Sequence, residues 1–67
     1  GDLDLEDIDM EDEANQKAVL KEYLKEKGIA SEKINKRITR YEDLGALEDE
    51  ATDALEELKE IKTAKKE

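Results

Sequence analysis

The spacing of hydrophobic residues changes along the chain and predicts three helices after residue 13. In the first helical segment, Leu20, Tyr23, Leu24 and Lys27 fall at i, i+3, i+4 and i+7, with the apolar residues Ala14, Ala18 and Val19 beside them. This is the period of an amphipathic helix. Gly28 supplies a left-handed residue that ends the helix, and Ile29 is expected to pack back against the last turn.

A second helix is expected after Ser31, whose hydroxyl can cap the free N–H groups of the first turn. The apolar stripe of this helix consists of Ile34, Ile38 and Tyr41. Its opposite side carries a basic stripe, which consists of Lys33, Lys36, Arg37 and Arg40. The helix is expected to end near Leu44, because Gly45 is another stop signal.

A third helix is expected to begin near Leu47. Three acids follow directly, and carboxylates are favourable at the positive end of the helix dipole. The helical spacing then continues through Leu47, Ala51, Ala54, Leu55, Leu58 and Ile61. Residues 63–67 are mainly polar and are expected to form a frayed tail.

The predicted fold class is therefore all-α, with a small three-helix bundle over residues 14–62. The turns between the helices are short, which favours packing of consecutive helices against one another. The expected large core residues are Val19, Leu20, Tyr23, Leu24, Ile29, Ile34, Ile38, Tyr41, Leu44, Leu47, Leu55, Leu58 and Ile61. A chain of 67 residues supports one domain of marginal stability.

Residues 1–13, termed the acidic arm, show a different pattern, in which eight acids are interleaved with a few large apolar residues. Acidic residues alternating with hydrophobic ones are typical of disordered segments that bind by their hydrophobic side chains. The partner-binding residues predicted here are Leu3, Leu5, Ile8 and Met10. We expect them to dock on a partner protein whose groove is apolar or rimmed by Lys and Arg.

Charge is distributed in three blocks. Residues 1–16 hold eight acids and no base, residues 17–40 hold eight bases and three acids, and residues 41–67 hold ten acids and four bases. The overall net charge is −9, which opposes simple attraction to phosphate or to anionic membranes. The middle block gives the first two helices a basic face, and the third helix has an acidic one.

Composition excludes several kinds of site. The chain has no Cys and no His, so disulfides, thiolates and histidine-based catalysis are absent. The carboxylates between Asp2 and Asp9 lack the turning glycine of a calcium-binding EF-hand loop. We therefore expect no enzymatic activity, no metal and no cofactor. No apolar run approaches a membrane span and no signal peptide is visible, so a soluble cytoplasmic protein without a membrane partner is expected.

These observations favour a non-enzymatic protein-interaction module that binds a partner through the acidic arm and its helical faces. One alternative is a helix-turn-helix-like nucleic-acid binder over residues 18–40, whose basic stripe is masked by the acidic arm. Leu24 stands where such a motif usually has a small residue. Another alternative is a structural or scaffold component of a larger assembly, such as a viral one. The third helix would then form a homo-oligomer seam through Leu47, Ala54, Leu58 and Ile61.

The stretch from Tyr23 to Leu55 also resembles the three-helix repeats of RecX-type regulators of recombinase filaments. It shares a Lys-x-x-Gly helix end, an isoleucine stripe in the second helix and a pattern before the third helix formed by Leu44, Gly45, Leu47, Glu48, Asp49 and Glu50. The aromatic residues usual after the glycine and in the third helix are missing. We do not assign the chain to this family on that pattern.

Overall fold

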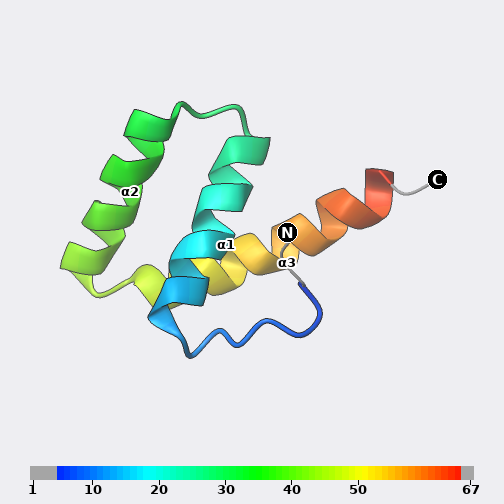
Figure 1. The fold of residues 1–67 in the computed structure, drawn as a ribbon, viewed down its shortest axis with the longest axis horizontal. Helices are drawn as coiled ribbons and strands as arrows, with labels where there is room; N and C mark the ends of the chain where they lie inside the picture. Colours follow the sequence, from blue (N-terminus) through cyan, green and yellow to red (C-terminus); the bar gives the residue numbers. More distant parts are fainter. Residues whose placement is uncertain (1–4, 66–67) are drawn as a thin grey trace.

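The computed structural model describes residues 5–65, with side chains described as far as Ile61. It contains three helices, α1 (Glu13–Glu26), α2 (Ser31–Leu44) and α3 (Leu47–Lys65), and the described residues include no strand. The predicted all-α three-helix bundle is confirmed. In Figure 1, α1 and α2 run in opposite directions, and α3 passes across α1, against which it makes its main contact.

Helix α1 begins and ends at residues that satisfy its free backbone groups. The side chain of Asp12 accepts a hydrogen bond from the Ala14 N–H at 2.9 Å and so caps the helix, which begins at Glu13, one residue before the predicted start. At the other end Gly28 has φ +80°. The N–H of Ile29 donates to the Leu24 carbonyl at 3.1 Å, which is the hydrogen bond of the predicted Schellman turn.

The predicted capping role of Ser31 is wrong. Ser31 is itself the first helical residue of α2, and the preceding Ala30 occupies the cap position in an extended conformation, with no side-chain hydrogen bond. The N–H of Ile34 is satisfied instead by the Ala30 carbonyl at 3.0 Å. The Gly45 stop is confirmed, since this residue has φ +69° and follows directly after α2.

Helix α3 continues to Lys65, beyond the boundary at residue 62 that the sequence pattern predicted. No glycine or proline follows Ile61 in the helix, so no residue interrupts the backbone hydrogen bonding. The fraying of residues 63–67 remains a prediction.

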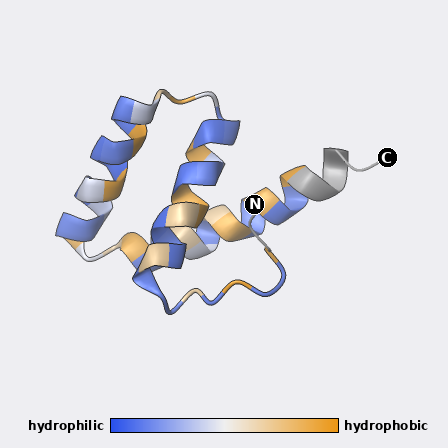
Figure 2. Ribbon diagram, viewed as in Figure 1, coloured by the Kyte–Doolittle hydropathy of each residue, from blue (hydrophilic) through white to orange (hydrophobic). Residues whose placement is uncertain are grey.

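The core lies between the three helices, and its largest part is the contact between α1 and α3. The buried hydrophobic residues are Val19, Leu20, Leu24, Ile34, Ile38, Leu47, Ala51, Ala54, Leu55 and Leu58. Two of them, Ala51 and Ala54, are small and allow the backbones of α1 and α3 to approach closely. Figure 2 shows that the hydrophobic positions of α2 lie on the side that faces α1.

Most of the predicted large core residues lie in the core or against it, and Leu44 and Ile61 are the exceptions. Ile61 is half-buried and is not among the residues that pack against the core. Tyr23, Ile29 and Tyr41 are half-buried and pack against the core. Leu44 is 71% exposed, so its assignment to the core was wrong. It is the last residue of α2, and the helical rotation after Tyr41 carries it off the apolar stripe.

Candidate binding surfaces

The described part of the acidic arm packs on the protein's own bundle. Leu5, Ile8 and Met10 are half-buried and lie against the core. Leu3, the fourth predicted partner-binding residue, lies outside the described residues, as do the other residues of 1–4. Leu5, Ile8 and Met10 are thus already in contact with apolar surface in the isolated chain.

Two side chains at the start of α1 hold the acidic arm in place. Gln16, a buried polar residue that is 7% exposed, donates from Nε2 to the Met10 carbonyl at 2.7 Å. Asn15 donates from Nδ2 to the Asp9 carbonyl at 3.0 Å. These bonds fix residues 9–12 against α1. Disorder over residues 1–13 and docking of the arm on a partner both remain predictions.

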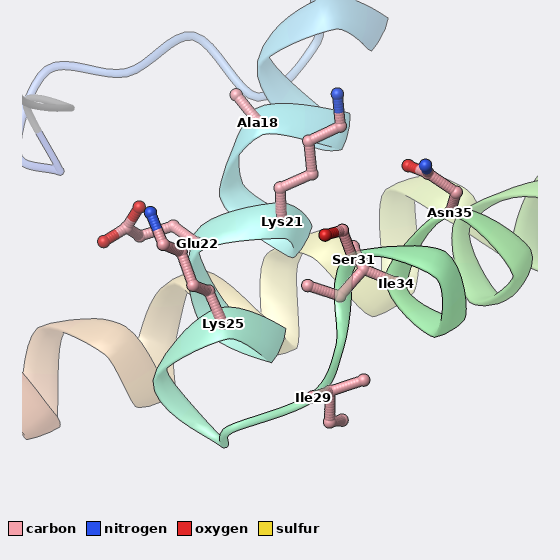
Figure 3. A pocket seen from close by; sticks show the side chains of 8 residues that line it. All are labelled: Ala18, Lys21, Glu22, Lys25, Ile29, Ser31, Ile34 and Asn35. Atoms are coloured by element: carbon pink, nitrogen blue, oxygen red, sulfur yellow. The ribbon is translucent and has the colours of Figure 1, made fainter.

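A second surface is an open groove between α1 and α2, termed the α1–α2 groove. Its volume is about 580 Å³ and it is lined by Ala18, Lys21, Glu22, Lys25, Ile29, Ser31, Ile34 and Asn35. Figure 3 shows Ile34 of α2 and Ile29 of the connecting turn across from the α1 side chains. Together with Ala18, these two isoleucines give the groove an apolar floor.

The α1 side of this groove carries two lysines and one acid, Glu22, so its net charge is positive. Lys21 and Lys25 are exposed, lie one helical turn apart and flank the floor. Neither lysine forms an ion pair within the part of the chain that the structure describes. The groove therefore presents apolar surface beside two cations that are available to an external anion.

An ion pair joins α1 and α2 at the end of the helices away from the connecting turn. Lys17 Nζ lies 2.7 Å from Glu42 Oε2. The hydrogen bond to Glu42 raises the pKa of Lys17 above its ordinary value of 10.5, against a smaller lowering by burial. This contact fixes the distance between the two helices at that end, while the turn at residues 27–30 fixes it at the other.

The four residues of the basic stripe come together on the outer flank of α2. Lys33, Lys36, Arg37 and Arg40 are all exposed and line a shallow cleft of about 250 Å³ in which no other residue takes part. None of them forms an ion pair among residues 5–61. The stripe is thus a concentrated positive charge on a chain with net charge −9.

The acidic arm does not run along this stripe in the region that the structure describes. In Figure 1 the described arm passes under α1 toward the middle of α3, and most of α2 stands apart from it. Masking of the basic stripe by the arm therefore has no support from residues 5–12, and it remains a prediction.

A smaller hollow of about 230 Å³ lies between the three helices, and a polar cluster ties α1 to α3 beside it. Arg37 of the basic stripe also lines this hollow, together with Glu50, Asp53 and Glu57 of α3. The Tyr23 hydroxyl donates to Glu57 Oε1 at 3.1 Å, and Lys27 Nζ lies 4.0 Å from the same oxygen. The Lys27 ammonium is 5.3 Å from the centre of the Tyr23 ring, within range of a cation–π contact. The hydrogen bond, ion pair and ring contact give this cluster a structural role.

Neither the α1–α2 groove nor the burial of Gln16 follows from the sequence pattern. The groove residues Lys21 and Lys25 differ by four positions, which places them on one side of α1. That spacing does not show whether α2 covers them. Gln16 follows a row of acids and has no sequence feature that distinguishes it from an exposed glutamine.

Comparisons with known protein families, with curated proteins and with solved structures find no match. The RecX resemblance therefore rests on the sequence pattern alone. Among the described residues, no group of three or more acids is arranged to hold a metal ion. In the same part of the chain, no helix combines the length and the apolar character needed to cross a bilayer.

Proposed function

We propose that this chain is a non-catalytic protein-interaction module whose main binding surface is the α1–α2 groove. Its partner is a protein segment that combines acidic and apolar side chains. The observation that carries the proposal is an apolar floor beside the unpaired cations Lys21 and Lys25. The floor consists of the half-buried Ala18 and Ile29, with Ile34, which is only 7% exposed, beneath them.

The size of the groove supports this function. A volume of about 580 Å³ falls in the range of roughly 300–1,000 Å³ that is usual for sites that bind organic ligands. The groove lies between two helices and is open to solvent, a setting that suits a peptide segment or an amphipathic helix. The half-buried Ile29 and Ala18 would contact the apolar side chains of such a segment.

The charge around the groove supports an acidic partner. Lys21 and Lys25 have no partner of their own within the described residues, although the chain has 21 acids and 12 bases. Acids on the bound segment would pair with both lysines. Complementary charge speeds the encounter and selects among partners more than it raises affinity.

The acidic arm provides a second contact in this proposal. Leu5, Ile8 and Met10 are only half-buried, so part of each side chain is available to a partner without unfolding of the bundle. Full docking of the arm on another protein would require release of the Gln16 hydrogen bond to the Met10 carbonyl. The groove needs no such release, which makes it the primary surface.

The proposal is tested with a labelled synthetic peptide that has the sequence of residues 1–13, because that segment is a concrete acidic and apolar ligand. Its affinity for the full chain is measured by fluorescence anisotropy. Lys25→Glu is expected to weaken binding about fivefold, as for the loss of one exposed ion pair of up to ~1 kcal/mol. The matched control Lys59→Glu makes the same charge change on α3 and should leave the affinity within error.

A second peptide separates the apolar contribution from the charge. Its Leu, Ile and Met residues are replaced by Ser, so that its net charge is the same. We expect this peptide to bind much more weakly than the first. Equal binding of the two peptides, or equal weakening by Lys25→Glu and Lys59→Glu, would show that only the overall charge of the chain matters and would refute the groove as the binding site.

A further inference from the structure

We propose that the basic stripe is a second, independent binding site, and that its ligand is a run of adjacent phosphate groups, as in an oligophosphate or a single-stranded nucleic acid. The cleft on the outer flank of α2 is lined by Lys33, Lys36, Arg37 and Arg40 alone. This inference does not depend on the function proposed for the α1–α2 groove, which uses other residues.

The lack of ion pairs in the stripe is the first observation. The chain has 21 acids for 12 bases, and three of those acids, Glu32, Glu42 and Asp43, lie on α2 itself. Even so, no cation of the stripe lies within ion-pair distance of a carboxylate among the described residues. Four like charges that share one cleft repel one another, and a multivalent anion would relieve that repulsion.

The lining of the cleft indicates which kind of anion fits. A peptide gains most of its affinity from apolar anchors, and this cleft has no apolar residue in its lining. It offers four cations with their hydrogen-bond donors, carried on the aliphatic stems of the same side chains. Phosphate groups bind through those two interactions, and arginine can donate two parallel hydrogen bonds to one phosphate. The α1–α2 groove differs in this respect because isoleucines line it.

The net charge of −9 does not prevent such binding at close range. At physiological ionic strength the screening length is about 8 Å, so a ligand seated in the cleft responds mainly to the four nearby cations. The described part of the acidic arm runs on the other side of α1, as Figure 1 shows, and leaves the stripe open. Lys33 and Arg40 are seven residues apart, which spans about 10 Å along the helix axis.

The test uses two probes on the full chain, a single-stranded oligodeoxythymidylate and inorganic tripolyphosphate. For the oligonucleotide, the logarithm of the association constant is plotted against the logarithm of the salt concentration. Four phosphate contacts predict a slope of about −2.8, and Lys36→Gln or Arg40→Gln should each reduce its magnitude by about 0.7. Lys59→Gln on α3 removes the same charge elsewhere and should leave the slope unchanged.

The two probes distinguish the source of the phosphates. Binding of tripolyphosphate that is weakened by Arg40→Gln, without binding of the oligonucleotide, identifies a free oligophosphate as the ligand. Oligonucleotide binding with the predicted slope identifies a nucleic-acid backbone. The proposal is overturned if neither probe binds at low salt, if Lys59→Gln weakens binding as much as Arg40→Gln, or if an oligoglutamate peptide competes as well as either probe. Circular dichroism of each variant checks that the exposed substitutions leave the helices intact.

Discussion

Leu58 and Val19 are the largest side chains that are fully enclosed, one from each of the two helices that form the main contact. Leu44 has the same hydrophobic character as Leu58, yet it is 71% exposed. The contribution of a leucine to stability therefore depends on its position, and the two residues form a matched pair for measurement.

Leu58→Ala is expected to destabilise the protein by about 2–5 kcal/mol, since a buried leucine leaves a cavity when truncated. A core in a chain of this size provides roughly 3–5 kcal/mol of net stability, so a large fraction of the variant molecules should be unfolded. Helix content and urea denaturation followed by circular dichroism measure the loss. Leu44→Ala should stay within about 0.5 kcal/mol of the parent. Equal effects of the two substitutions would contradict this packing.

Gly45 connects α2 to α3 and has φ +69°. A Cβ added there would meet no atom within 4 Å, so the cost of a side chain is conformational alone. Gly45→Ala is expected to lower the free energy of unfolding by about 1–2 kcal/mol. Gly45→Asn should cost less, because asparagine tolerates the left-handed region. Urea midpoints that are the same for Gly, Ala and Asn would show that the turn does not need this conformation.

At the scale of the elements, α2 is the helix with the fewest buried side chains. It buries only Ile34 and Ile38, and glycines with positive φ lie before and after it. Its distance from α1 is set by the connecting turn and by the ion pair between Lys17 and Glu42. That distance determines the width of the α1–α2 groove.

The Lys17–Glu42 ion pair predicts a dependence of stability on alkaline pH. The pKa of Lys17 is raised in the folded protein by its hydrogen bond to Glu42. The stabilisation is therefore complete below the unfolded pKa of about 10.5 and is lost as the pH rises through the folded pKa. Urea midpoints of the parent and of Lys17→Met should differ at neutral pH and converge at high pH. A difference that stays constant through the alkaline range would exclude this contribution.

Gln16 links α1 to the acidic arm and predicts how tightly the arm is held. Gln16→Ala removes the bond from Nε2 to the Met10 carbonyl. Loss of roughly 1 kcal/mol should make the amides of residues 9–12 exchange their hydrogens about fivefold faster, while the helices keep their protection. Hydrogen exchange followed by NMR measures both. Unchanged exchange in residues 9–12 would mean that the apolar contacts of the arm alone hold it.

At the scale of the whole molecule, the spacing of residue types along the sequence predicted those features that are determined within a single helix. The helix order, the stops at Gly28 and Gly45 and the basic stripe on α2 follow from spacing within about four turns. The packing of Leu5, Ile8 and Met10 on the core and the opening between α1 and α2 could not be predicted in this way. Both depend on how one segment packs against another and not on the spacing within one helix, and Gln16 gives no local sign of its burial.

Over the whole chain, the unpaired cations and most of the acids lie in different segments. The α1–α2 side carries six cations without ion pairs among the described residues, Lys21, Lys25, Lys33, Lys36, Arg37 and Arg40. The acids are concentrated in the arm and on α3. A partner of acidic character would therefore approach from the α2 side, and the groove and the stripe lie on opposite flanks of that helix.

The most direct test of the groove as the primary binding surface is a two-dimensional amide NMR titration of the full chain with the peptide of residues 1–13. We predict dispersed peaks before addition, and then shifts concentrated at Ala18, Lys21, Lys25, Ile29 and Ile34. Shifts confined to residues 9–16 or to the exposed face of α3, with the groove amides unmoved, would contradict the proposed function.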